Sequence, residues 1–344
     1  MVAIASGPPI RDGLARHRRA LVRTAQVGLV AAIGWFLVRP QLAAVDLASL
    51  RAADRGWLAL AALAAGLSML SLTLLTVRLL PPVGRPAWSR VARSDVSALA
   101  LGRSVPNGGA VGIAVNLRLL ADQGVTVRDA TVSKLAQGIG SGMVLHLLIL
   151  LGLAGSALAG AWAPWGWLPL VTSAAFLGFG AVVLTAAGRP RMWAVLGSGL
   201  SRMPRVGTRL GAAVAGVGQA EAIGHLRAST ATPRRAAPML GCSIGIWVGD
   251  ALALWAALRA FGVHAGLLAL LVAYAAQSVS GWVPITPGGV GIAEVMMIPA
   301  LVALGGAEPA VAGGIVAWRV VAYWLPIPLG VLAYASLTWR RPRH

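Results

Sequence analysis

Long apolar runs are the feature of this sequence that most restricts its fold. A helix that crosses a bilayer needs about 20 predominantly apolar residues. Six runs of this kind cover residues 21–38, 57–80, 127–158, 165–186, 236–261 and 307–338. Only 11% of the 344 residues are charged and 58% are hydrophobic, so the chain has too few polar side chains to cover a water-soluble particle. The sequence predicts an all-α polytopic membrane protein with about six spanning helices.

The basic residues lie in short clusters between these runs. The chain has 29 Lys and Arg against 10 Asp and Glu, and the clusters occupy the N-terminal tail, the 78–93 and 187–235 connections and the C-terminal tail. Basic loops stay on the cytoplasmic side of a membrane. We therefore predict a multi-pass protein of the cell inner (plasma) membrane with both termini in the cytoplasm. Because the clusters are dispersed, no nucleic acid is expected as a partner.

The 187–235 connection combines eight arginines and one acid, Glu221, with scattered apolar residues. This pattern is typical of an amphipathic helix that lies on a membrane surface. We expect the connection to contact anionic lipid headgroups.

Two further apolar stretches, 94–122 and 267–304, are each broken at the middle by proline and paired glycine. Because basic loops stay in the cytoplasm, each stretch must return to the side of the membrane from which it enters. Each is therefore predicted to form a re-entrant helical hairpin, and irregular backbone at membrane depth is tolerated only where it is buried in protein or lines a wet cavity.

The two breaks carry similar strings, Val105–Ala114 (VPNGGAVGIA) and Ile285–Ala293 (ITPGGVGIA), about 180 residues apart. The flanking runs follow the same offset, which predicts an inverted repeat with halves 1–160 and 161–344. Chance similarity in a chain rich in glycine, alanine and valine is the alternative. Inverted repeats with broken helices at the midplane are typical of secondary transporters.

The breaks are the first candidate ligand site. Backbone amides at the start of a half-helix form a seat for phosphate, whereas a hinge whose groups bind only neighbouring helices is the structural alternative. The candidate substrate-binding residues at the two breaks are Pro106, Asn107, Gly108, Gly109, Pro287, Gly288, Gly289 and Gly291.

Charged residues at membrane depth are the second candidate. Asp250, Glu294 and Arg319 fall near the middle of apolar runs, where charges are costly and mark pathways or mutual pairs. We predict that Arg319 faces one of the two carboxylates and leaves the other free to titrate or to contact substrate. A purely structural ion pair is the alternative.

Three more polar residues complete the predicted substrate site. Arg118 and Lys134, the only lysine, are placed near the cytoplasmic end of the first hairpin, either to attract an anionic headgroup or as ordinary snorkelling residues. Gln277 belongs to the second hairpin. We predict no catalytic residue, metal or cofactor, because Ser141 and His146 are poorly spaced for one helical face and no metal or nucleotide motif occurs.

The run from Pro284 to Glu294 (PITPGGVGIAE) resembles a motif of the lysylphosphatidylglycerol synthase transmembrane-region family, whose members are flippase-like. An earlier motif of that family resembles Pro106 to Leu120, with Arg118 at its arginine position and Val115 where the family often has an acid. The resemblance covers about 20–340. It implies translocation of an anionic or amphiphilic lipid, or of a polyprenyl-phosphate carrier.

The predicted function is therefore a flippase-like transporter that moves such a lipid across the cytoplasmic membrane, with a homodimer as the candidate assembly. The alternative is an accessory or regulatory lipid-binding membrane protein that partners a glycosyltransferase or a lipid-modifying enzyme. An enzyme is not expected.

Overall fold

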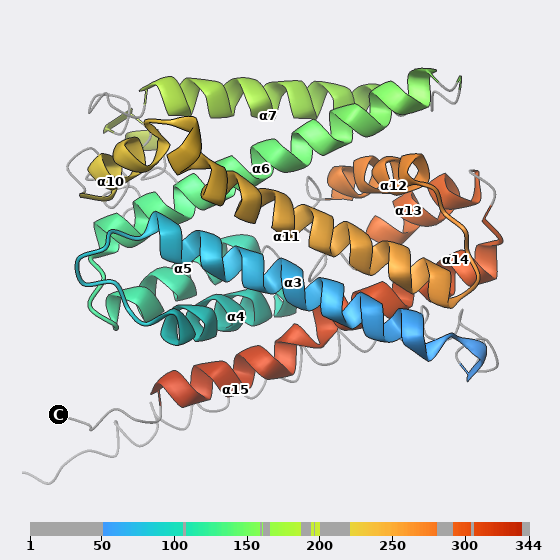
Figure 1. Ribbon diagram of the computed structural model, residues 1–344, viewed down its shortest axis with the longest axis horizontal. Helices are drawn as coiled ribbons and strands as arrows, with labels where there is room; N and C mark the ends of the chain where they lie inside the picture. Colours follow the sequence, from blue (N-terminus) through green and yellow to red (C-terminus); the bar gives the residue numbers. More distant parts are fainter. Residues whose placement is uncertain are drawn as a thin grey trace, which may run out of the picture.

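The computed structural model describes residues 51–105, 108–158, 160, 166–186, 194–195, 197–199, 221–280, 292–303 and 306–338. Regular structure in these residues is helical throughout (Figure 1). The helices are α3 (Arg55–Leu79), α4 (Trp88–Ser104), α5 (Gly108–Ala121), α6 (Val127–Leu158), α7 (Trp167–Ala186), α10 (Glu221–Thr230), α11 (Pro233–Ala260), α12 (Leu267–Ser280), α13 (Ile292–Val302), α14 (Glu308–Arg319), the π-helical turn η4 (Val320–Trp324) and α15 (Pro326–Thr338).

Four helical stretches are long and apolar enough to cross a membrane: Arg55–Leu79, Val127–Leu158, Pro233–Ala260 and Glu308–Thr338. They correspond to four of the six predicted runs. The predicted run 165–186 is α7, a shorter apolar helix, and the predicted run 21–38 lies outside the described residues.

Large apolar side chains cover much of the outer surface. Leu63, Leu151 and Leu332 are 72%, 63% and 68% exposed, respectively. Exposed apolar surface of this extent is unfavourable in water and is typical of a surface that contacts lipid. The chain is a helical membrane protein.

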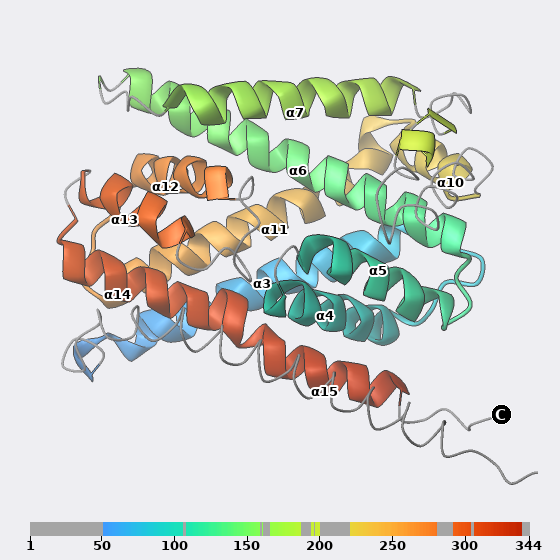
Figure 2. The ribbon, with the colours of Figure 1, turned by 180° about the vertical axis from the view of Figure 1, so that it is seen from behind.

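Helices α3 and α11 form a close antiparallel pair at the centre of the molecule (Figures 1 and 2). Small residues permit the contact, since a Cβ atom added to Gly249 would lie 3.0 Å from the Ala64 carbonyl oxygen. The Ser68 hydroxyl donates to the Ile246 carbonyl at 2.7 Å. Close backbone approach through small residues, together with side-chain hydrogen bonds between helices, is how helices associate in lipid.

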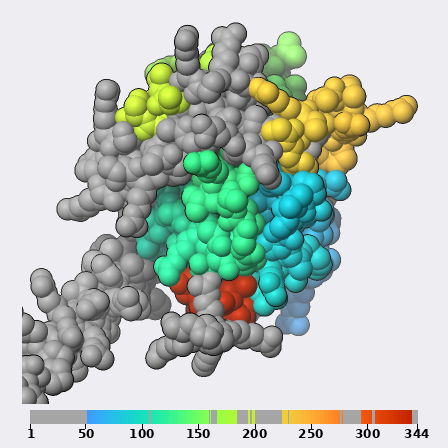
Figure 3. Space-filling view, turned by 90° about the vertical axis from the view of Figure 1, so that its left-hand side faces the viewer, coloured from blue at the N-terminus to red at the C-terminus, as the bar shows by residue number. Residues whose placement is uncertain are grey.

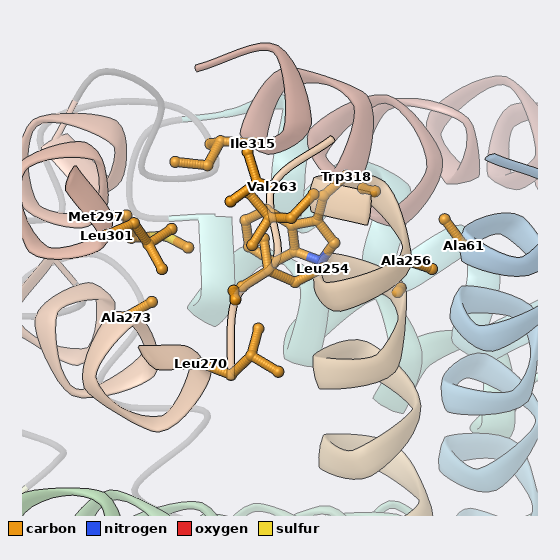
Figure 4. Close-up of a cluster of buried hydrophobic side chains, with 14 of the residues drawn as sticks. Ala61, Leu254, Ala256, Val263, Leu270, Ala273, Met297, Leu301, Ile315 and Trp318 are labelled. Atoms are coloured by element: carbon orange, nitrogen blue, oxygen red, sulfur yellow. The ribbon is translucent and has the colours of Figure 1, made fainter. Parts of the chain in front are cut away.

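The main apolar core lies where α11 packs against α3, α12, α13 and α14 (Figure 4). Leu254, Met297, Ile315 and Trp318 are completely buried there. This core fixes α13 and α14 against α11, and it therefore positions the charged residues that these helices carry.

The two predicted hairpins appear as helix pairs, α4–α5 and α12–α13, at opposite ends of the α3–α11 pair (Figures 1 and 2). The first begins at Trp88 rather than at 94, because the amphipathic turn that carries Arg90 and Arg93 continues into the apolar part of α4. That turn is not apolar, so hydropathy alone does not reveal it. Re-entry of either pair into a bilayer stays a prediction.

Each hairpin packs against a long helix from the other half of the chain. The first contacts α15, where Gly330 accommodates Val96 and Ala100 of α4. The second contacts α6, where Gly152 accommodates Leu271 of α12. The two halves are therefore interlocked rather than separate.

Candidate functional site

The tip of the first hairpin is built from glycines whose roles differ. A Cβ atom at Gly108 would lie 1.8 Å from the Gly102 carbonyl oxygen, so no side chain fits there. A Cβ atom at Gly109 would meet nothing within 4 Å. Gly108 therefore permits close contact between α4 and α5, and Gly109 leaves open space at the start of α5.

A pocket of about 300 Å³ lies along this hairpin, between α4 and α5 and against α3 and α6. Gly108 and Gly109 line it at the tip together with Arg103, and Asp95 and Lys134 line it further along the hairpin. Arg103 and Asp95 are eight residues apart on α4, which corresponds to about 12 Å of helix. The pocket is thus a groove with charged residues at both ends.

Lys134 is the centre of a hydrogen-bond network at one end of this groove. Its Nζ donates to Asp95 Oδ1 at 2.7 Å, to Gln137 Oε1 at 2.9 Å and to Thr76 Oγ1 at 3.1 Å. The three bonds account for all three protons of the ammonium group. The partners come from α3, α4 and α6, so the network ties the first hairpin to the long helices.

Two acceptor atoms in this network have no hydrogen-bond partner in the part of the chain that the structure describes. Asp95 Oδ1 accepts from Asn116 Nδ2 at 2.8 Å, whereas Asp95 Oδ2 and Asn116 Oδ1 accept no bond. Both side chains are 2% exposed and both line the groove. Buried polar atoms are nearly always paired, so these two are suited to receive donors from a bound molecule.

At the other end of the groove, Arg103 joins the two halves of the chain. Its Nη1 donates to the Ala322 carbonyl oxygen, and its guanidinium carbon lies 4.5 Å from the centre of the Tyr323 ring. The Arg319 guanidinium lies 4.3 Å from the centre of the same ring. Ala322 and Tyr323 lie in η4, and Arg319 is the last residue of α14. π-Helical turns occur frequently at functional sites.

Arg319 and Glu294 form a buried ion pair, with 2.8 Å between Nε and Oε1. Their side chains are 1% and 6% exposed. This confirms that Arg319 faces one of the two predicted carboxylates. The pair joins α13 to α14, so the second hairpin too is tied to the long helix that follows it.

The other carboxylate, Asp250, lies outside this ion pair, and both of its oxygens accept hydrogen bonds. That it titrates or contacts substrate stays a prediction. Tyr274 Oη donates to Asp250 Oδ2 at 2.8 Å, and Trp318 Nε1 donates to Oδ1 at 3.1 Å. Asp250 therefore joins α11 to α12 and α14. A tyrosine and a tryptophan supply these donors from distant positions, which is why charge pairing alone did not find them.

The remaining predicted residues fall in three places. Gln277 donates through Nε2 to Tyr323 Oη at 3.1 Å, which brings it to the Arg103 end of the groove. Arg118 is exposed and does not line the groove. The residues outside the described part of the chain are Pro106, Asn107, Pro287, Gly288, Gly289 and Gly291.

Sequence reasoning missed Asp95, Arg103 and Tyr323. A signal for the first two was present, because an acid and a base within an apolar hairpin are costly unless they act or pair. Tyr323 has no such signal, since only the fold brings it beside Arg103.

No curated protein sequence is significantly similar to this chain. The profile of the family described as "Lysylphosphatidylglycerol synthase TM region" matches residues 23–330. This match covers most of the chain and agrees with the family that the motifs at 106–120 and 284–294 resemble. The chain belongs to the lysylphosphatidylglycerol synthase transmembrane-region family.

Proposed function

We propose that this protein moves a lipid with an anionic headgroup across the cell inner membrane, and that the groove along α4 and α5 is the polar path for the headgroup. The family associates the chain with lipid handling. Transport, direction of insertion and a cytoplasmic location of both termini belong to the proposal.

The observation that carries this proposal is the charge of Arg103. Among the described residues no carboxylate lies within ion-pair distance of its guanidinium, which donates to a carbonyl oxygen and lies over an aromatic ring. An unpaired guanidinium among apolar helices is expensive. A phosphate oxygen of a lipid headgroup would accept the remaining donors of Arg103.

The interlocking of the two halves supports movement rather than static binding. Each hairpin packs against a long helix of the other half, and the Arg103 contact with η4 is one of the points where the two halves meet. Transporters built from inverted repeats expose a central site alternately by rocking one repeat against the other. A change at the Arg103 contact would therefore alter the packing of both halves.

A leaflet-exchange assay tests the proposal. The purified chain is reconstituted into liposomes with fluorescent phosphatidylglycerol, phosphatidylethanolamine or a polyprenyl phosphate, and exchange is followed by quenching of the outer leaflet. We expect faster exchange than in protein-free vesicles for at least one anionic lipid. Arg103→Gln should lower the rate at least tenfold, since it removes the cation from the path.

Arg128→Gln is the matched control, because Arg128 lies at the start of α6, is exposed and does not line the groove. It should leave the rate unchanged. Absence of exchange above empty vesicles for every lipid contradicts transport, and co-purification of a stoichiometric partner would then favour the accessory role.

A further inference from the structure

Two pockets adjoin at the end of the molecule where α3 ends and α10 packs against α6. In Figure 3, which looks onto this end, α10 and the start of α11 (yellow) lie beside the end of α3 and the connection after it (cyan). One pocket has a volume of about 300 Å³ and the other of about 400 Å³. Both are lined by Met239 and by residues of α10, so they are neighbours.

The smaller pocket is apolar. Its walls are mainly aliphatic side chains of α3, α6 and α11, including Leu75, Leu135, Ile139 and Leu240. Gly140 leaves part of it open, since a Cβ atom there would meet nothing within 4 Å. An apolar pocket of this kind in a membrane protein fits a hydrocarbon chain, because most of its lining is aliphatic. Its polar lining residues are Arg227, Thr230 and Ser243.

The larger pocket is basic. Arg78, Arg85, His225 and Arg235 line it, and no described lining residue is acidic. Arg85 Nη1 donates to the Val77 carbonyl at 3.1 Å, and Arg235 Nη1 contacts the Ala228 carbonyl at 3.4 Å. These backbone contacts hold two guanidinium groups in place and leave their other donors available, which is the arrangement that suits phosphate.

We infer that the two pockets together bind one anionic phospholipid. Its phosphate lies among Arg78, Arg85 and Arg235, and one acyl chain occupies the apolar pocket. Separation of charge and hydrocarbon into adjoining pockets matches the two parts of such a lipid. The bound lipid would hold α10 against α3 and α6, so it would also position the connection that contains α10.

This site is distinct from the groove of the first hairpin. On α6, Lys134 and Gln137 face the groove, whereas Leu135, Ile139 and Gly140 face the apolar pocket. The helix itself therefore separates the two. The inference holds whether or not the groove carries lipid.

Native mass spectrometry of the delipidated full chain in detergent tests the inference. Phosphatidylglycerol and phosphatidylcholine with identical acyl chains are titrated separately. We expect phosphatidylglycerol to bind at least tenfold more tightly than phosphatidylcholine. The double variant Arg78→Gln/Arg235→Gln should lower its affinity to that of phosphatidylcholine, because both phosphate-binding cations are lost.

The acyl chain is tested by Gly140→Leu, whose side chain fills the apolar pocket and should lower binding of both lipids at least fivefold. Gly138→Leu is the matched control, since Gly138 is exposed on the same helix, does not line the pocket and has equal space for a Cβ atom. Arg103→Gln should leave binding unchanged, which separates this site from the groove.

Two results would overturn the inference. One is equal affinity of the intact chain for both lipids. The other is phosphatidylglycerol binding that survives both the arginine and the Gly140 changes. The arginine variant alters only exposed side chains, so it tests the headgroup contact even where Gly140→Leu does not fold.

Discussion

The two hairpins are anchored alike but surrounded differently. Each is tied to the long helix that follows it by one buried ion pair, Asp95–Lys134 at 2.7 Å and Glu294–Arg319 at 2.8 Å. The second pair lies beside the apolar core, where Trp318 is completely buried. The first pair lines a groove and retains an acceptor atom without a partner. The same kind of ion pair therefore lies against an apolar core in one half and beside a groove in the other.

This difference is also visible in the contacts around each pair. Around Asp250 and Arg319 the second half places tyrosine, tryptophan and glutamine donors. Around Lys134 the first half places threonine and glutamine side chains, and glycines line the adjoining groove. Aromatic side chains fill space, whereas glycine leaves it open, so among the described residues this groove adjoins the first pair.

The largest expected effect comes from breaking the buried Glu294–Arg319 ion pair. Arg319→Gln leaves Glu294 buried without its cation, and breaking a buried pair in this way costs about 3–5 kcal/mol. Lys134→Gln should cost less, because Lys134 is more exposed and lies beside a cavity that admits water. Unfolding in mixed micelles measures both free energies. An equal or larger loss of unfolding free energy for Lys134→Gln contradicts the contrast between the two ion pairs.

The next effect concerns the contact between α4 and α5, the two arms of the first hairpin. Gly108→Ala places a Cβ atom against the Gly102 carbonyl, and overpacking against backbone costs up to about 3 kcal/mol. Gly109→Ala, one residue away, should be neutral because the space there is open. The two melting temperatures give the comparison. Similar values for both variants would mean that the arms are not in contact.

A smaller effect is expected at the carboxyl group of Asp250. Tyr274→Phe removes the donor to Asp250 Oδ2 and should cost about 2 kcal/mol, since it leaves a buried acceptor unsatisfied. Tyr334→Phe is the control, because Tyr334 is 37% exposed. The same unfolding measurement applies. A neutral Tyr274→Phe would show that Asp250 does not depend on this bond.

The smallest effect is expected in the groove. Asn116→Ala removes one hydrogen bond to Asp95 Oδ1, which still accepts from Lys134, so the cost should be about 1 kcal/mol. If the groove binds a lipid headgroup, the variant should slow leaflet exchange by more than this small loss of stability suggests. A loss of stability above that of Tyr274→Phe would indicate a closed network rather than an open one.

The sequence predicted well those features that depend on neighbouring residues. Apolar runs matched α3, α6, α11 and the α14–α15 stretch, because the length of a spanning helix is a local property. The cost of a lone intramembrane charge also predicted correctly that Arg319 faces one of the two carboxylates. It did not identify the partners of Asp250, which are neutral donors.

The sequence by itself determined that the chain is helical, that it belongs in a membrane and where the first hairpin breaks, because the hydrophobicity of a run and the conformational freedom of glycine act within a few residues. Only the tertiary structure decided that Arg103 meets Ala322 and Tyr323, more than 200 residues away, and that Asp95 meets Lys134. These contacts depend on how α4 packs against η4 and α6. Packing is set by the shapes of complete helices, which no local pattern contains.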